Sequence, residues 1–181
     1  MRGPPAMFRP LICAALICSA VLNAQTATYR FAGTGCTGGR LSPGIGPVPL
    51  SVTGTPRLGG SFDVQTEGST NYPWGNRRTV FLLTGSSDRS AFGVPLPFDV
   101  AGLSPGSPFC GLLRTSGEAV VQVPSTFPYT AMATVRFVIP NDPSLLGVVV
   151  HQQVLSIERS TFGPPFSALA LSASGIGTIG R

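Results

Sequence analysis

Apolar and polar residues alternate over most of the chain beyond residue 27, in short runs that Gly and Pro interrupt. Residues 131–139, AMATVRFVI, show the pattern most clearly. Successive side chains of a β-strand point to opposite faces of the sheet. The spacing therefore predicts a strand here, with one side facing a hydrophobic core and formed by Ala131, Ala133, Val135, Phe137 and Ile139.

Nine further runs have the same character and predict further strands, at residues 28–34, 48–53, 60–66, 79–85, 95–100, 110–115, 118–123, 147–158 and 166–174. The 23 Gly and 18 Pro are spread along the chain, which is typical of short strands joined by turns. No long window after the N-terminal segment carries a helical stripe. We predict a single all-β domain over residues 25–181, an antiparallel β-sandwich of jelly-roll or Greek-key type.

The first 24 residues differ from the rest. Arg2 and Arg9 precede an apolar run of about 12 residues, which a short polar stretch follows. This layout predicts a secretory signal peptide over residues 1–24, with cleavage after Ala24 or, alternatively, after Ala20. The run is shorter than the roughly 20 residues that a membrane-spanning helix needs. We expect a secreted protein, extracellular or periplasmic, with no membrane span in its mature form.

The charged residues do not indicate a particular binding partner. All 12 basic residues are arginines, set against 7 acidic residues, and the formal net charge is +5. A nucleic-acid-binding protein gathers such residues on one face or along one helix, whereas here they are scattered. We therefore expect no nucleic-acid partner, and we expect a monomer.

Two cysteines remain after the signal peptide, Cys36 and Cys110. An even number in an exported chain predicts a disulfide rather than a metal site, and two reduced, buried cysteines are the alternative. His151 is the single histidine, which excludes metal sites built from two or more imidazoles of one chain. We predict no metal and no cofactor.

Residues 33–38 match the glycine fingerprint of dinucleotide-binding proteins, Gly33-x-Gly35-x-x-Gly38. In those proteins a helix follows the glycines directly, and its N-terminus holds the pyrophosphate. The sequence continues here as RLSPGIGPVP, whose prolines are incompatible with that helix. We interpret the glycines as a loop that positions Cys36 for its disulfide.

Residues 102–106, GLSPG, match the Gly-x-Ser-x-Gly pattern, and Asp142 and His151 follow in the order of an α/β-hydrolase triad. The residue after the nucleophile must donate its N–H to the oxyanion hole, but Pro105 has no N–H. We therefore predict a turn around Ser104 and no catalytic residues. A glycoside hydrolase remains an alternative, and it would require two carboxylates facing each other across a cleft.

Residues 71–78, NYPWGNRR, combine aromatic rings with amide and guanidinium donors in a loop rich in Pro and Gly. A flat ring can cover the C–H face of a sugar while such donors bind its hydroxyl or carboxylate groups. The candidate ligand-binding residues are Tyr72, Trp74, Asn76, Arg77 and Arg78. The alternative is that Trp74 packs inward and caps the core.

Several segments together resemble a group of uncharacterised bacterial secreted β-rich modules: GTGCTGG, GTPRLGGSFDV, FVIPNDPSLLGVVVHQQ and SALALSASGIGTIG. The resemblance spans residues 29–180. It implies that Cys36 and Cys110 are the group's paired cysteines, and that Gly147 and Gln153 belong to its segment of glycine, apolar strand and glutamine. The chain departs from the group at Phe109, where glycine is commoner. No activity is established for the group, so the resemblance implies fold and export alone.

These observations favour a non-catalytic secreted structural or interaction module, which contacts an envelope or extracellular protein through apolar surface patches. The first alternative is a carbohydrate-binding module that holds a polysaccharide at the Tyr72 to Arg78 loop. The second alternative is the secreted glycoside hydrolase.

Overall fold

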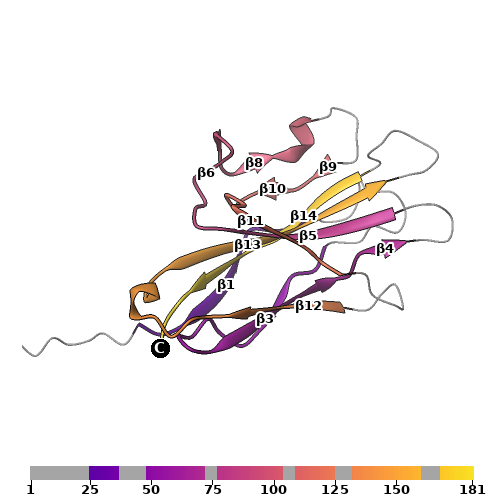
Figure 1. The fold of residues 1–181 in the computed structure, drawn as a ribbon. Helices are drawn as coiled ribbons and strands as arrows, with labels where there is room; N and C mark the ends of the chain where they lie inside the picture. Colours follow the sequence, from indigo (N-terminus) through magenta and orange to yellow (C-terminus); the bar gives the residue numbers. More distant parts are fainter. Residues whose placement is uncertain (1–24, 37–47, 72–76, 104–108, 125–131, 160–167) are drawn as a thin grey trace, which may run out of the picture.

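A computed structural model describes residues 25–36, 48–71, 77–103, 109–124, 132–159 and 168–181. Apart from two short 3₁₀ helices, the regular structure in these ranges consists of strands (Figure 1). Their sheets are antiparallel except for one short parallel pair. The all-β prediction and the Cys36–Cys110 disulfide are confirmed. No helix in the described ranges is long and apolar enough to cross a membrane. The predicted signal peptide lies outside these ranges.

The larger sheet forms the middle of the molecule. Its strands follow the order β1 (Thr28–Ala32), β14 (Ala168–Thr178), β13 (Val149–Arg159), β5 (Arg77–Gly85) and β11 (Ala119–Gln122). Two short strands extend it, β4 (Thr70–Asn71) beside β5 and β9 (Phe109–Cys110) beside β14. Most of the predicted strands are found within a few residues of their expected ends.

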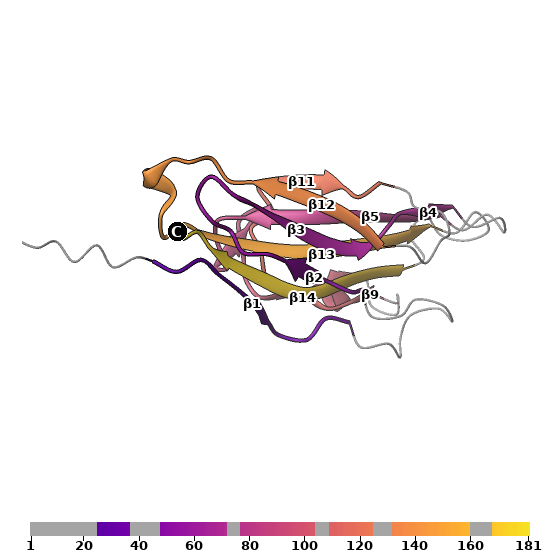
Figure 2. The same ribbon diagram turned by 90° about the horizontal axis from the view of Figure 1, so that it is seen from below.

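A second sheet packs against one face of the larger sheet, which we call the inner face (Figure 2). Its order is β12 (Met132–Val138), β3 (Ser61–Glu67) and β2 (Ser51–Thr53). The core between the sheets contains buried apolar side chains of both, among them Phe62, Val64, Val80, Leu82, Ala133 and Val154. The two sheets therefore form a sandwich-like pair, and the jelly-roll or Greek-key subtype stays a prediction.

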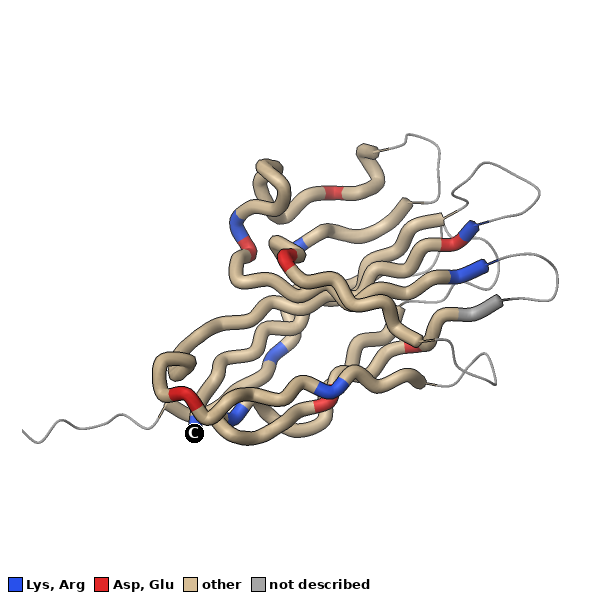
Figure 3. Tube along the Cα trace, viewed as in Figure 1, with Lys and Arg blue, Asp and Glu red and all other residues tan. Residues whose placement is uncertain are grey.

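Strand β12 has the faces that its alternation predicts. Ala133 is buried and Val135, Phe137 and Ile139 pack against the core, whereas Met132 and Val138 are 46% and 72% exposed. On the exposed face Arg136 donates to both carboxylate oxygens of Asp63, at 2.8 and 2.9 Å. Charged side chains are otherwise sparse along the strands (Figure 3).

A third layer covers part of the other face of the larger sheet, which we call the outer face. It consists of the pair β8 (Phe98–Asp99) and β10 (Leu112–Leu113), the helix η1 (Val100–Leu103) and the hairpin β6 (Ser90–Ala91) and β7 (Val94–Pro95). Val100, Leu83 and Leu171 are the buried centre of a second apolar cluster between these elements and the sheet. The larger sheet is therefore packed on both faces, which explains why its strands contain continuous apolar runs.

Strand β14 is longer than predicted because its glycines make room for a tyrosine. Tyr29 of β1 lies opposite Gly177, and its ring covers Gly175 and Gly177, where side chains would collide with it. The Tyr29 hydroxyl donates to Oε1 of Gln152 at 2.8 Å. Burial raises the pKa of the Tyr29 phenol. Strand β14 therefore continues through Gly175 and Gly177 instead of ending before them.

The segment that contains Cys36 continues the edge of the larger sheet beyond β1. The N–H of Cys36 donates to the carbonyl of Leu171 at 2.9 Å, and a side chain at Gly35 would collide with the backbone of β14. Cys110 pairs with Ala170 on β14. The glycine loop thus places Cys36 beside β9, with 5.5 Å between the Cα atoms of the two cysteines.

Candidate functional site

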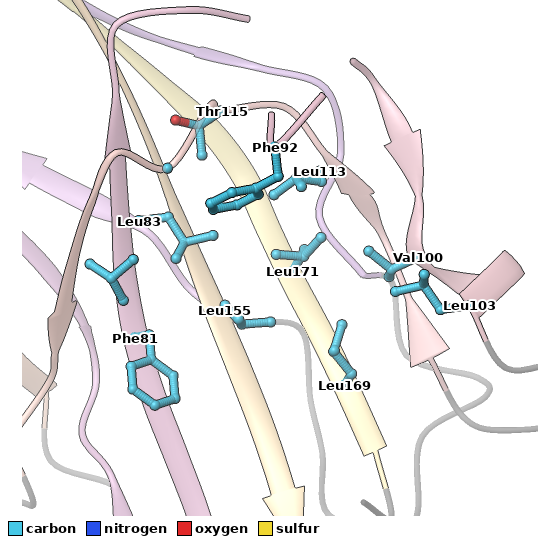
Figure 4. Close-up of a pocket in the computed structure, with 12 residues that line it drawn as sticks. Phe81, Leu83, Phe92, Val100, Leu103, Leu113, Thr115, Leu155, Leu169 and Leu171 are labelled. Carbon is cyan, nitrogen blue, oxygen red and sulfur yellow. The ribbon is translucent and has the colours of Figure 1, made fainter. Parts of the chain in front are cut away.

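The outer face and the third layer enclose a pocket of about 410 Å³ (Figure 4). This volume lies within the range of small-molecule binding sites. Its described lining is apolar except for one side chain and consists of Phe81, Leu83, Phe92, Val100, Leu103, Leu113, Thr115, Gly117, Val120, Leu155, Leu169 and Leu171. We call it the outer-face pocket.

The polar side chain of this lining is already engaged. Thr115 is fully buried, and its hydroxyl donates to the backbone carbonyl of His151 at 3.2 Å. The described lining therefore offers a ligand no free side-chain donor, and it contains no carboxylate or imidazole that could act as a general acid or base. Such a pocket can recognise a ligand through apolar contact and shape.

Large apolar side chains also surround the opening of the pocket. Phe92 is 85% exposed, Leu103 is 59% exposed and Val120 is 54% exposed. Scattered apolar side chains are normal on a surface, but these three line the same pocket, and exposed apolar side chains at a pocket are typical of binding sites. In Figure 4 the Phe92 ring lies at one end of the pocket beside Thr115, and Phe81 lies at the other.

Phe92 occupies a backbone position that disfavours it. It has φ of 50° and the following Gly93 has φ of 80°, in the two-residue turn between the paired residues Ala91 and Val94. Turns with positive φ at both central residues prefer Asn followed by Gly, because a bulky side chain is strained there. A strained and exposed phenylalanine over a pocket suggests a functional constraint.

Gln153 holds the third layer onto the outer face. This side chain is fully buried. Its Nε2 donates to the carbonyls of Leu112 and Ser172, both at 2.8 Å, and its Oε1 accepts the N–H of Arg114 at 2.9 Å. The amide thus joins both ends of β10 to strands β13 and β14, which positions one wall of the pocket.

A smaller pocket of about 240 Å³ adjoins the first on the same face. Its described lining consists of Arg77, Thr79, Phe81, Gln122, Ile157 and Arg159. Phe81 lines both pockets. The charged groups of this lining are both arginines, so we call it the arginine pocket.

The structure separates the two adjacent arginines of the predicted ligand loop. Arg77 is exposed and lines the arginine pocket, whereas Arg78 is 6% exposed and faces inward. Arg78 forms an ion pair with Glu67 and donates to the Ser156 hydroxyl at 2.8 Å. Glu158 lies opposite Arg78, and burial raises the pKa of its carboxyl while the nearby guanidinium opposes that shift. Arg78 thus belongs to an internal ion pair and is not part of the exposed surface.

The other predicted ligand residues, Tyr72, Trp74 and Asn76, lie outside the described residues, as does Ser104. Asp142 caps the short helix η2 (Pro143–Leu145) and accepts the N–H of Ser144 at 2.9 Å. His151 is buried on β13. Within the described ranges no three His, Cys, Asp or Glu side chains gather as metal ligands would.

The sequence interpretation missed the outer-face pocket. One signal could have revealed it: the run TVFLL, residues 79–83, carries apolar residues at consecutive positions instead of alternate ones. Such a run predicts a strand that is covered on both faces. The residues that close the pocket from the third layer, such as Phe92 and Leu103, carry no comparable local signal.

Glu118 stabilises the turn at the Thr115 end of the pocket, which leads to a pH-dependent prediction. Its carboxylate accepts hydrogen bonds from the Ser116 hydroxyl at 2.7 Å and from the N–H and hydroxyl of Ser86 at 2.8 and 2.9 Å. These bonds lower the pKa of Glu118 from 4.5 to about 2. Because the folded pKa lies below the unfolded one, the stabilisation is present above pH 4.5 and is lost as the pH falls toward 2.

We therefore expect the variant Glu118→Gln to melt at a lower temperature than the wild type at about pH 6, and expect the difference to shrink toward about pH 2. Thermal unfolding followed by circular dichroism across this range measures it. A difference in melting temperature that stays constant with pH would contradict the assignment.

Neither a model of a known protein family nor a curated protein matches the chain.

Proposed function

We propose that the protein is a non-catalytic secreted binding module whose outer-face pocket takes an apolar ligand. One observation carries this proposal: a pocket of about 410 Å³ in which the described lining is apolar and the Thr115 hydroxyl is engaged. The disulfide and the signal-like N-terminal segment support export. The proposal gives the interaction-module hypothesis a defined surface.

The energetics require a ligand that fills the pocket. Burial contributes about 0.8 kcal/mol for each methylene group. Association costs at least about 4 kcal/mol in lost translational and rotational freedom, so a ligand of a few carbons would not bind measurably. Since the described lining offers no free side-chain donor, affinity should increase with the apolar area of the ligand.

The direct test is titration of the purified protein with the neutral fluorescent probe N-phenyl-1-naphthylamine, whose emission increases in an apolar environment. We expect saturable binding with one site per chain. If the probe's emission does not increase in the presence of the folded protein, the proposed function is contradicted.

The variant Phe92→Asn should separate binding from stability. Asparagine suits the turn better, so we expect the free energy of unfolding to rise by about 1 kcal/mol. Loss of the ring should weaken probe binding about fivefold, since covering part of the exposed Phe92 ring with the probe would contribute about 1 kcal/mol. The measurements are urea unfolding and probe titration.

The matched control is Val138→Asn, which also replaces an exposed apolar side chain but lies on β12 of the other sheet. It should leave probe affinity unchanged. Equal probe affinity of wild type and Phe92→Asn would show that the ring does not contact the ligand.

The carbohydrate-binding alternative keeps one supporting observation, the exposed Arg77 beside the polar side chains of Thr79 and Gln122. Binding to immobilised glycans that is lost in a folded Trp74→Ala variant would favour it. The glycoside hydrolase gains no support from either pocket, because neither described lining contains an acidic residue.

A further inference from the structure

We propose that the ligand of the outer-face pocket is an anionic amphiphile, whose apolar chain lies in that pocket and whose anionic group lies in the arginine pocket at Arg77. This inference rests on the proposed function and specifies its ligand. The shared chemistry is a single apolar chain that ends in a carboxylate, sulfate or phosphate group.

The two pockets adjoin each other at Phe81 on the outer face. Phe81 lines both of them. Figure 4 shows Phe81 at the edge of the outer-face pocket, away from Phe92 and Thr115. Beyond Phe81 the same face of β5 carries Thr79 and then Arg77. Four residues of a strand span about 13 Å. A chain that leaves the apolar pocket past Phe81 therefore meets the arginine pocket next.

The electrostatics of the arginine pocket favour an anion. Arg77 of β5 and Arg159 of β13 lie directly opposite each other in the antiparallel register. The Arg77 side chain is exposed at this position, and its guanidinium would attract an anion. The side chains of Thr79 and Gln122 add hydrogen-bond donors.

On the outer face the charge of Arg77 has no acidic counterpart among the described residues that line the pocket. The described lining of the arginine pocket contains no Asp or Glu. Glu158 precedes Arg159 on β13 and so points to the inner face, where Glu67 forms its ion pair with Arg78. Figure 3 shows basic positions at the neighbouring ends of β5 and β13. The inner-face pairing leaves Arg77 available for a ligand.

A free amphiphile fits this site better than a bilayer surface. The outer-face pocket has a volume of about 410 Å³ and lies between a sheet and a covering layer. It is therefore suited to a single apolar chain, which must leave a bilayer or come from solution. We assign the site to an amphiphile taken up as a single molecule.

The test compares two amphiphiles of equal chain length, dodecanoate and dodecanol, as competitors of N-phenyl-1-naphthylamine below the concentrations at which either aggregates. We expect dodecanoate to bind the wild-type protein about tenfold more tightly, as a charge-assisted contact would give. Added salt should weaken dodecanoate binding and leave dodecanol binding unchanged. This salt comparison uses the wild-type protein alone, so it does not depend on the folding of a variant.

The variant Arg77→Gln should weaken dodecanoate binding by about the same tenfold factor and leave dodecanol binding unchanged. The matched control is Arg30→Gln, an exposed arginine of β1 in the same sheet that lines neither pocket. It should change neither affinity. A loss that Arg77→Gln shows equally for both competitors would overturn the assignment of the anionic group.

The outcomes distinguish this inference from the proposed function. If neither competitor nor the probe binds, the proposed function fails. If both competitors bind equally and salt has no effect, binding in the apolar pocket is supported and the assignment of an anionic group to the ligand is overturned. If the protein sediments with anionic phospholipid vesicles but does not bind dodecanoate, uptake of a single amphiphile is overturned.

Discussion

Replacing Gln153 by leucine is expected to lower the free energy of unfolding by about 4 kcal/mol and to abolish probe binding in the outer-face pocket. The Gln153 amide makes three hydrogen bonds, to the carbonyls of Leu112 and Ser172 and from the N–H of Arg114. Leucine has a similar volume, so the substitution leaves no cavity. It leaves one buried backbone group, the carbonyl of Ser172, and two part-buried ones without this partner, and an unpaired buried group costs about 1–3 kcal/mol.

The functional consequence follows from where those bonds lie. Leu112 and Arg114 flank Leu113, which lines the pocket. Without the amide, β10 loses its side-chain attachment to the larger sheet, and the wall that it provides should separate from Leu171. Urea unfolding measures the stability change, and amide hydrogen exchange at residues 109–115 measures the separation of β10.

The matched control is Gln65→Leu on β3, where the glutamine makes one long and exposed contact to Ser51. We expect a change of less than about 0.5 kcal/mol there. A Gln153→Leu variant as stable as this control, with unchanged exchange in β10, would show that the third layer does not depend on the amide.

The strands could be predicted because their pattern is local. In β12 the alternation of Ala133 and Val135 with Met132 and Thr134 fixes both the strand and its buried face. Two cysteines beyond the N-terminal segment also allow only one pairing. Both features could be predicted from residue type and local spacing alone, without knowledge of the rest of the fold.

The start of β5 was predicted two residues late, and this changes the candidate site. With the strand expected at residues 79–85, Arg77 and Arg78 belonged to one loop and one ligand surface. The strand begins at Arg77, because Arg77 and Arg78 pair with both β4 and β13. Neighbouring residues in a strand face opposite sides. Arg78 faces inward and pairs with Glu67 of β3, a contact that the pattern of residues 77–85 does not reveal.

The outer-face pocket could not be predicted because its wall comes from segments that are irregular and far apart in the chain. Val100 and Leu103 lie on a single 3₁₀ turn, and Phe92 lies in a turn that usually holds asparagine. None of these positions repeats with a strand or helix period. Their common property is that they line one pocket together with residues of β5, β13 and β14, and this pocket exists only once the sheet is assembled.

Loss of the Cys36–Cys110 disulfide is the second large effect. The bridge closes a loop across a sequence separation of 74 residues. In the chain-entropy account, opening such a loop in the unfolded state costs the protein about 4 kcal/mol of stability. We expect this loss for the double variant Cys36→Ser with Cys110→Ser. The reduced wild type, in excess reductant, should unfold at the same urea midpoint as the double variant.

This stability loss should leave the affinity of the pocket nearly unchanged, unlike the loss in Gln153→Leu. The disulfide acts mainly on the unfolded chain, whereas in the folded protein β9 still pairs with β14 at Leu169 and Ala170. Probe titration of the double variant, under conditions where it is folded, measures the affinity. If the double variant loses binding while its urea midpoint stays unchanged, the disulfide shapes the folded pocket instead, and the entropic account is wrong for this bridge.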